Sequence, residues 1–432
     1  MPSTIVHPPS DATATPGDLA ARLRAHIEGT LDAHLALLQH MVAVNSFSTN
    51  AEGVDAVGWL TAEAFAPLGF DAERVPSRTS GFGQHLILRR PGPADRPMRR
   101  IALVSHLDTV YAADEERANG FGWRPEGDRI YGPGTVDIKG GTVVARMVLD
   151  AVVACAPEVA DRVDWIVALD AAEERMAPDF GPLLRGLLGP DALACLVFES
   201  ARLDGGVLRL VTARKGMAKL RVEVAGTSAH AGNAHHQGAN AIVQLARLVE
   251  RMADLTDPSR DLTVNVGIVR GGTVRNRVAH HAEASLEIRA FDPAVLDEAV
   301  AAVQALAGPG DVVSRDGTAR CQVRVVLEGT QTAWPPNPAT ERLFVAFARA
   351  AEPLGLRAEP EARGGLSDGN RAWDLAPTLD GLGPAGGNMH ASEHDPASGR
   401  EQEYVEPGSL VPKALVTALA ICDLVQGAEA AP

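Results

Sequence analysis

The chain has 432 residues, of which 46% are apolar, so it is long and apolar enough to bury a sizeable core in two or more domains. Its formal net charge is −15, and the acidic residues are spread along the chain rather than gathered in a tail. This balance argues against nucleic acid or an anionic membrane surface as the main partner.

The N-terminus and the cysteines bear on location. Residues 1–17 are rich in Pro, Ser, Thr and Asp and have no basic start followed by an apolar stretch, so we expect a disordered segment and no secretory signal. No apolar run is expected to reach the roughly 20 residues of a membrane span. None of the cysteines has CxxC spacing, which favours reduced thiols and a cytoplasmic protein. They are Cys155, Cys195, Cys321 and Cys422.

From about residue 19 the chain alternates helical patterns with short apolar runs, which is typical of an α/β sheet. Helices are predicted over 19–44 and 140–155, and buried strands over 101–105, 163–169 and 192–198.

The pattern changes after about residue 214, where the predicted strands alternate between apolar and polar residues. Strands are predicted over 216–224, 262–269 and 282–288, and helices over 240–252 and 293–306. A further helix over 339–356 marks the return to the first pattern. We therefore predict a two-domain protein: a mixed-sheet α/β domain formed by residues 18–214 and 330–432, and an inserted α+β domain, 215–329, with one solvated sheet face.

Polar side chains follow three of the predicted strands. His106 and Asp108 follow the first, the pair Glu173 and Glu174 the second, and Glu199 the third. In open α/β sheets, ligands bind beyond the carboxyl ends of the strands. A lone HxD is common and adjacent glutamates are usually solvated, but all of these residues in this order favour one site.

Asp137 adds a carboxylate in a glycine-rich loop that leads into a predicted helix. One histidine with several carboxylates suits zinc, manganese or cobalt. The number of candidate ligands is sufficient for two ions that share a bridging carboxylate.

These motifs resemble those of the M20 metallopeptidase family, and in particular its carboxypeptidase G2-like, or glutamate carboxypeptidase, branch. The resemblance covers roughly residues 20–425 and keeps the motifs in the family's order. The matching segments are His106-Leu-Asp-Thr-Val, Gly134-Thr-Val-Asp-Ile-Lys-Gly-Gly, Ala172-Glu-Glu, Phe198-Glu and Gly386-Gly-Asn-Met-His.

The resemblance implies two divalent ions, Zn²⁺ by preference with Co²⁺ or Mn²⁺ as alternatives. It makes Asp137 the bridging ligand, with His106 and Glu199 on the first ion and Glu174 and His390 on the second. By the same resemblance, Asp108 orients the His106 ring, and Glu173 is the general base that activates a water between the ions.

The insert, 215–329, resembles the family's dimerisation (lid) domain, which makes the remainder the metal-binding catalytic domain. The resemblance implies a homodimer in which His230 reaches the partner's active site. It also implies that Asn276 and Arg289 bind the substrate, with Arg289 as a clamp for a free carboxylate, and that Gly365 lies in a glycine-rich substrate loop.

The sequence departs from the family pattern at three places. Ala172 stands where an Asp is usual, His235 stands where a Pro is usual, and the stretch after His390 is longer than typical. That stretch contains His394, which is an alternative to His390 as a ligand.

The expected activity is hydrolysis of an amide or peptide bond in a small substrate that carries a carboxylate, either a C-terminal amino acid such as glutamate or an N-acyl amino acid. Aminoacylase, dipeptidase or deacylase activity is the alternative within the family. A serine hydrolase that uses Ser367, in Gly365-Leu-Ser-Asp-Gly, and a non-catalytic binding homologue are the rival hypotheses outside it.

Overall fold

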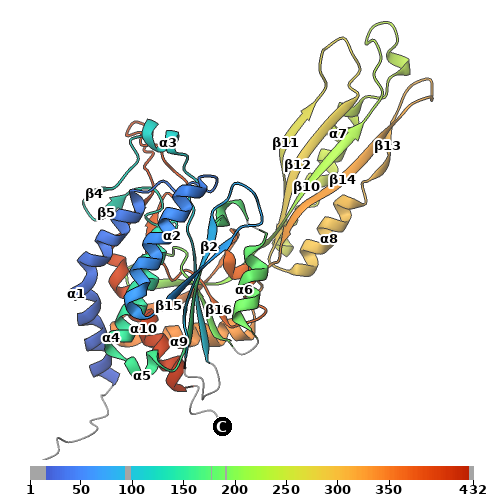
Figure 1. The fold of residues 1–432 in the computed structure, drawn as a ribbon. Coiled ribbons are helices and arrows are strands. Elements are labelled where there is room, and N and C mark those ends of the chain that lie inside the picture. The colour runs from blue at the N-terminus through green and yellow to red at the C-terminus, as the bar shows by residue number, and fades with distance from the viewer. Residues whose placement is uncertain (1–15, 93–98, 177, 190–191, 428–432) are drawn as a thin grey trace, which may run out of the picture. The chain divides into compact units, whose positions relative to one another are not determined.

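The computed structural model describes residues 16–92, 99–176, 178–189 and 192–427, which form two compact units (Figure 1). The larger unit comprises residues 1–210, 343–359 and 380–432, and the smaller comprises 211–342 and 360–379. Most of the N-terminal segment that was expected to be disordered, residues 1–15, lies outside the described residues, and the first helix begins at Pro16.

The larger unit is built around five strands of a mixed sheet, in the order β1-β2-β6-β3-β7. The strands β6, β3 and β7 run parallel, whereas β2 pairs antiparallel with β6 and β1 antiparallel with β2. The parallel strands are buried almost throughout because both sheet faces are covered, which explains their continuous apolar sequences. The bounds are β1 Asp71–Pro76, β2 Gln84–Arg90, β3 Arg100–His106, β6 Asp164–Asp170 and β7 Ala192–Val197.

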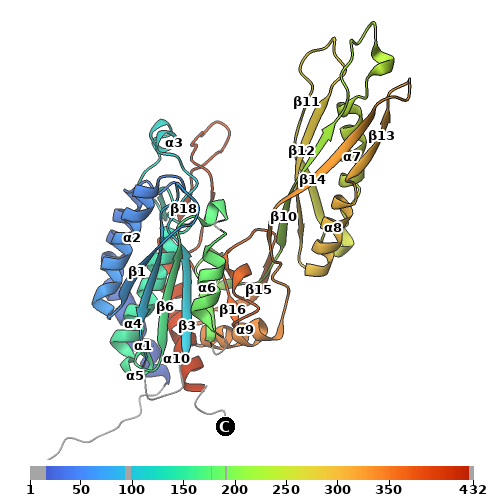
Figure 2. The same cartoon turned by 45° about the vertical axis from the view of Figure 1, so that its right-hand side comes forward.

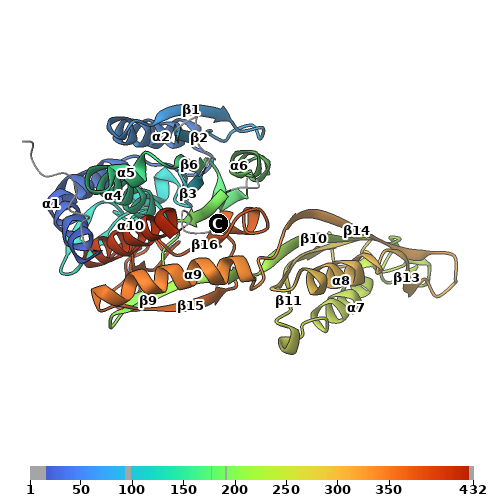
Figure 3. The ribbon, with the colours of Figure 1, turned by 90° about the horizontal axis from the view of Figure 1, so that it is seen from below.

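Helices cover both faces of this sheet, with α4 on one face and α6 on the other (Figure 2). The helices α1, α4 and α10 pack against one another beside the sheet (Figure 3). The bounds are α1 Pro16–Val42, α2 Ala51–Phe65, α3 Ala113–Ala118, α4 Lys139–Cys155, α5 Pro157–Ala160, α6 Phe180–Leu188 and α10 Leu410–Gly427.

The segment Pro407–Gly427, which includes α10, is long and apolar enough to cross a membrane by length and composition. This corrects the sequence prediction that no apolar run approaches that length. In the structure, 72% of its most apolar stretch is buried inside the unit, where α10 packs against α1 and α4.

A second, small sheet in the larger unit has the order β17-β18-β5-β4. Its strands are β4 Arg124–Glu126, β5 Arg129–Tyr131, β17 Gly386–Gly387 and β18 Tyr404–Val405. It brings the chain around residue 130 together with segments near the C-terminus, and β17 leads directly to His390.

The smaller unit is a five-stranded antiparallel sheet, in the order β11-β12-β10-β14-β13, with α7 and α8 packed on one face. Buried and less buried residues alternate along β12, because the helices α7 and α8 cover one face of the sheet and no helix among the described residues packs on the other. The bounds are β10 Gly216–Ala225, α7 Ala241–Ala253, β11 Thr263–Gly271, β12 His281–Ala290, α8 Pro293–Gln304, β13 Gly308–Val313 and β14 Arg320–Gln331.

The remaining elements lie near the points where the chain passes between the units in sequence. They are β8 Leu203–Asp204, β9 Val207–Arg214, α9 Pro338–Ala351, β15 Arg357–Arg363 and β16 Thr378–Leu379. The fold confirms the predicted class, a mixed-sheet α/β domain and an α+β domain.

Candidate metal centre

The parallel strands place three predicted site segments at one edge of the larger unit's sheet. His106 is the last residue of β3 and lies opposite Asp170, the last residue of β6. A 3₁₀ turn after β6 carries Glu173 and Glu174, and Glu199 follows β7 by two residues. The carboxyl ends of parallel strands meet at the same edge, so side chains far apart in sequence converge there.

Two groups of donor atoms meet around the carboxylate of Asp137. Its Oδ1 lies 3.3 Å from His106 Nε2, which in turn lies 3.8 Å from Glu199 Oε1. Its Oδ2 lies 3.4 Å from His390 Nε2, which lies 3.3 Å from Glu174 Oε1. Each oxygen of Asp137 therefore faces a different imidazole and a different glutamate.

These residues fit a divalent metal site by the chemistry of their donors. His106, Asp137 and Glu174 each offer a donor atom, and these atoms lie within 4.8 Å of one another. Imidazole nitrogens and carboxylate oxygens are the usual zinc ligands in catalytic sites. Except for the half-exposed His390, the side chains of this group are at most 14% exposed, so the carboxylates are largely removed from solvent.

The proximity of Asp137 to the two imidazoles shifts the pKa of Asp137 and the pKa values of the imidazoles in opposite directions. Burial alone would lower the pKa of His106, but Asp108 and Asp137 raise it well above its ordinary value. Hydrogen bonds with Asp137 and Glu174 raise the pKa of His390 to about 11. Burial would raise the pKa of Asp137, but the two imidazoles hold it below its usual range. In the absence of a metal, the centre therefore favours protonated imidazoles beside ionised Asp137.

Asp108 orients the first imidazole. Its carbonyl oxygen and its Oδ1 lie 3.0 and 3.2 Å from His106 Nδ1, so this nitrogen carries the hydrogen and Nε2 is left to bind a metal. Oδ1 also accepts the backbone N–H of Glu173 at 3.1 Å, and Oδ2 accepts the Ser48 hydroxyl at 2.5 Å. No motif in the sequence pointed to Ser48, which lies 60 residues before Asp108.

The glycine pair after Asp137 allows close packing of the loop that carries it. A Cβ on Gly140 would lie 2.1 Å from the carbonyl oxygen of Thr135. A Cβ on Gly141 would lie 2.0 Å from the carbonyl oxygen of Phe198, next to Glu199. Only glycine permits these approaches, so the pair holds the segments of two ligands together.

The small sheet positions His390. Gly387 in β17 pairs with Tyr404 in β18, and a Cβ on Gly387 would lie 2.9 Å from the Tyr404 hydroxyl. Beyond β17 the backbone turns through residues with positive φ, 58° at Asn388 and 65° at His390. The conformation costs about 1–3 kcal/mol for a residue other than glycine and persists because the surroundings impose it.

Two further buried groups support the Asp137 loop. Lys139 is 1% exposed, its Nζ donates to the carbonyl oxygen of Val44 at 2.9 Å, and burial lowers its pKa to about 8. Glu403 is fully buried, and burial together with the charge of Asp137 raises its pKa to about 7. Sequence reasoning missed Glu403, although a charged residue directly before Tyr404 and Val405 was a possible signal.

The other predicted site residues lie in the smaller unit. The exposed His230 accepts the backbone N–H groups of Gly232 and Asn233 at Nδ1, at 3.2 and 3.0 Å. Asn276 is exposed, and its carbonyl oxygen accepts the N–H of Ala231, so it lies beside the His230 turn.

Arg289 contacts the segment that contains Gly365. Arg289 is held by Glu287, at 3.0 Å from Nε, and donates from Nη1 to the carbonyl oxygen of Gly364 at 2.9 Å. The carbonyl oxygen of Gly365 accepts a hydrogen bond from Arg214 at 3.0 Å.

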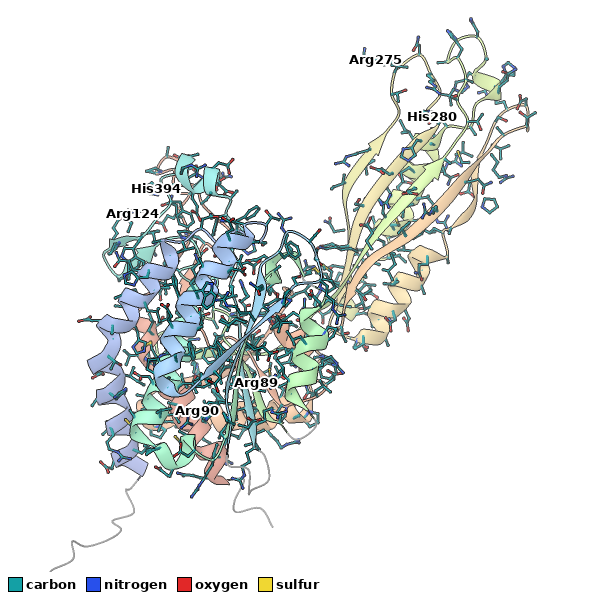
Figure 4. All side chains as sticks on the ribbon, in the orientation of Figure 1. Arg89, Arg90, Arg124, Arg275, His280 and His394 are labelled. Carbon is teal, nitrogen blue, oxygen red and sulfur yellow. The ribbon has the colours of Figure 1, made fainter. Side chains whose placement is uncertain are left out.

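The sequence offered two alternative site residues, Ser367 as a nucleophile and His394 as a metal ligand. Ser367 is 1% exposed, and its Oγ accepts the Gly369 N–H as the cap of a 3₁₀ helix. The strand before it, β15, is only partly buried and is not the apolar strand of a nucleophile elbow. His394 is exposed at the outer end of the larger unit, whereas the labelled His280 and Arg275 belong to the smaller unit (Figure 4).

Known proteins resemble this chain in sequence and in fold. The peptidase dimerisation domain family matches residues 212–312. Carboxypeptidase G2 of a Pseudomonas species is 27% identical over 395 residues, which cover 90% of this chain and 89% of the relative. Succinyl-diaminopimelate desuccinylase of Novosphingobium aromaticivorans is 27% identical over 346 residues, which cover 76% of this chain and 84% of the relative.

Solved structures share the fold. Aminopeptidase PepT from Bacillus cereus superposes with a TM-score of 0.69 at 22% identity, over 92% of this chain and 99% of that one. An M20 family metallo-carboxypeptidase from Sulfolobus solfataricus superposes with a TM-score of 0.64 at 15% identity, over 91% and 99% of the two chains. The chain therefore resembles the M20 metallopeptidases in sequence and in fold, with carboxypeptidase G2 among the similar proteins, which indicates an enzyme of the metallopeptidase and amidohydrolase type.

Proposed function

We propose that this enzyme is a dinuclear metal-dependent hydrolase that cleaves the amide bond of a carboxylate-bearing substrate. The observation that carries the proposal is the position of Asp137, whose two oxygens face the two groups His106 with Glu199 and His390 with Glu174. A carboxylate shared in this way suits two ions that lie a few ångströms apart. Zn²⁺ matches the donor set, with Co²⁺ and Mn²⁺ as alternatives.

When bound, the ions would polarise the amide carbonyl and lower the pKa of a water molecule. Glu173 would take a proton from that water and later hand it to the leaving nitrogen. Asp108 supports this role because it holds both the Glu173 backbone and the His106 ring. A base fixed beside a metal ligand is able to act without reorganising the site.

His230 would stabilise the oxyanion that develops on the carbonyl oxygen. Two backbone N–H groups point at its Nδ1, so the proton of the neutral ring is on Nε2, which is available as a donor. In the homodimer that we propose, this donor reaches the centre of the partner subunit. Asn276 lies beside the same turn and would contact the substrate there.

Arg289 would bind the free carboxylate of the substrate. Its side chain is 28% exposed, and its guanidinium is oriented by Glu287 and by the carbonyl oxygen of Gly364. A fixed guanidinium suits a carboxylate because the two planar groups form paired hydrogen bonds. Gly365, the next residue after Gly364, would line the same substrate loop.

The names of the relatives guide the choice of substrate. The similarity to carboxypeptidase G2 favours, as the substrate of this enzyme, an amide of a C-terminal amino acid such as glutamate. The similarity to the desuccinylases favours an N-acyl amino acid as the alternative substrate. We place the enzyme in the cytoplasm, a proposal supported by the free thiols of Cys155, Cys321 and Cys422.

The dimerisation surface that we propose is formed by α7 and the edge strand β11 of the smaller unit. Ile242 and Val243 on α7 are each 44% exposed, and Ile268 and Val269 on β11 are 49% and 57% exposed. An edge strand with exposed apolar neighbours is a template for pairing with another chain.

Activity on a substrate panel tests the proposed function. Metal-free enzyme is reconstituted with Zn²⁺, Co²⁺ or Mn²⁺ and assayed on N-acyl amino acids and folate-like glutamate amides. We expect hydrolysis only with metal, and loss of activity with a chelator but not with a serine-directed reagent. Activity that survives chelation and is lost to the serine reagent would favour Ser367 instead. Bound metal without hydrolysis of any member of the panel would indicate a binding homologue.

A further inference from the structure

Glu403 contacts the backbone of the residue on which the metal centre depends. It is fully buried, and its Oε1 accepts the N–H of Val136 at 2.9 Å and the N–H of Asp137 at 3.0 Å. The Asp137 carboxylate faces the two imidazoles, whereas Glu403 binds the backbone N–H of the same residue.

The second carboxylate oxygen of Glu403 reaches the His106 segment. Its Oε2 accepts the hydroxyl hydrogen of Tyr111 at 2.6 Å, and Tyr111 is itself 1% exposed. Tyr111 follows His106 by five residues, and its carbonyl oxygen accepts the side-chain amide of Asn45. The tyrosine therefore connects Glu403 to the loop after β3.

The backbone of Glu403 reaches the third ligand segment. Its N–H donates to the carbonyl oxygen of Ala391 at 2.8 Å, and Ala391 directly follows His390. Its carbonyl oxygen accepts the N–H of Gly132 at 3.2 Å, at the start of the Asp137 loop. One buried residue is thus bonded to the segments that carry His106, Asp137 and His390.

We propose that Glu403 is a positioning residue that sets the metal affinity of the centre by fixing the Asp137 backbone between the two imidazoles. This inference rests on the proposed function, since it requires that Asp137 binds metal. Without the carboxylate, two buried N–H groups and a buried hydroxyl would lose their acceptor, and the loop would shift to find others. Partners that orient metal ligands typically contribute 10–100-fold in metal affinity.

The substitutions Glu403→Leu and Glu403→Gln separate hydrogen bonding from shape. Leucine keeps the approximate volume but removes both acceptors. Glutamine keeps one oxygen that accepts the Val136 and Asp137 N–H groups, and its amide group can donate to the oxygen of Tyr111. A residue that only fills space would give the same result in both variants, whereas a positioning residue would be rescued by glutamine.

Glu401 provides the matched control. It lies two residues earlier, is 42% exposed, and pairs with Arg129 at 2.7 Å rather than with the Asp137 loop. The variants Glu401→Leu and Glu401→Gln make the same chemical changes at the surface of the same segment.

The test measures Zn²⁺ affinity of the metal-free proteins by competition with a chromophoric chelator, together with the visible spectrum of the Co²⁺-loaded forms. We expect a loss of about 10–100-fold in affinity and an altered cobalt spectrum for Glu403→Leu. For Glu403→Gln we expect affinity within a few-fold of the parent, and for both Glu401 variants no change.

Parental affinity and an unchanged cobalt spectrum in Glu403→Leu would overturn the inference while leaving the proposed function intact. If Glu403→Leu does not fold by circular dichroism, Tyr111→Phe removes one of the bonds to Glu403 and keeps the ring. Weaker metal binding by Tyr111→Phe would then support the inference, and parental affinity would overturn it. A parent protein that binds no divalent metal would overturn the proposed function and this inference together.

Discussion

Asp137 is the residue on which the chemistry of the centre depends, because its two oxygens are each within 3.4 Å of a different imidazole. The residues around it have separate tasks. His106, Glu174, Glu199 and His390 offer donor atoms, and Asp108 and Glu403 hold the segments that carry them. In the proposed function, Glu173, which directly precedes Glu174 in the 3₁₀ turn after β6, transfers the proton.

Glu173→Gln is expected to lower kcat by about two to four powers of ten or more, because the amide cannot take a proton from water. The metal content should stay unchanged, since Glu174 and the other donors remain. Steady-state kinetics and elemental analysis of the same preparation check both expectations. Activity near that of the parent would exclude Glu173 as the base.

Metal binding is expected to release protons and to strengthen as pH rises. In the metal-free centre the pKa of His390 is raised to about 11 and that of His106 is also raised, so both rings are protonated at neutral pH. A metal binds only the neutral ring, so each histidine must lose its proton, about two in total. Calorimetric titration with Zn²⁺ in buffers of different ionisation enthalpy measures this release. Binding without proton release, at an affinity independent of pH, would contradict the prediction.

The residue types in the sequence predicted the candidate metal ligands better than the residues that hold those ligands in place. His106, Asp137, Glu174, Glu199 and His390 stand in motifs or at strand ends, and the structure brings them together. Ser48 forms a hydrogen bond with Asp108, which lies 60 residues later in the sequence. Glu403 forms one with the backbone of Val136, which lies 267 residues earlier. Such partners leave no local pattern, so only the fold reveals them.

At the scale of elements, the loop that carries Asp137 depends on its packing against the segment after β7. The Gly141 position at the start of α4 lies so close to Phe198 that no side chain fits. The same contact places Glu199, the next residue, beside the Asp137 loop.

Gly141→Ala is therefore expected to destabilise the protein by about 1–3 kcal/mol or more, because the new methyl group would overlap a backbone carbonyl. The metal affinity should fall with it, since Glu199 would move. Gly186 in α6 is the matched control: nothing lies within 4 Å of its Cβ position, so Gly186→Ala should be neutral or stabilising by up to about 1 kcal/mol. Urea unfolding compares the two variants, and equal stability of both would refute the close contact.

Elements with strong patterns were predicted, and those without were missed. The continuous apolar runs predicted β3, β6 and β7 to within one or two residues, because buried strands have few polar positions. The strand β14 was missed, since most of its residues are exposed or only partly buried and its sequence is largely polar. The helix α10 was missed because it is apolar on nearly all sides, which leaves no helical period to detect.

At the scale of the whole molecule, the role proposed for His230 requires two chains. The smaller unit matches a peptidase dimerisation domain and exposes apolar side chains on its edge strand and on α7. The sequence predicted this unit as an α+β insert, although two of its five strands, β13 and β14, were not foreseen.

Val269→Lys is expected to convert the dimer to monomers, because it places a charge on the exposed edge strand β11. Leu327→Lys is the control, since this residue is 40% exposed on β14, away from that edge. Light scattering after size-exclusion chromatography reports the mass of each variant. A dimer that persists in Val269→Lys at low micromolar concentration would show that β11 is not the interface.

Mixing inactive Glu173→Gln and His230→Ala proteins tests whether His230 acts in the partner subunit. In a heterodimer, one of the two centres would have both an intact base and an intact histidine, so activity should return to about one quarter of the parental level after subunit exchange. No recovery in a mixture shown to contain heterodimers would place His230 in its own subunit's centre or outside catalysis.

The central claim is that Asp137 lies between two metal ions, and anomalous X-ray diffraction from crystals grown with Zn²⁺ tests it most directly. We expect two anomalous peaks, one contacted by His106, Asp137 and Glu199 and the other by Asp137, Glu174 and His390. Crystals in which zinc is absent from these residues, or in which Asp137 contacts no ion, would contradict it.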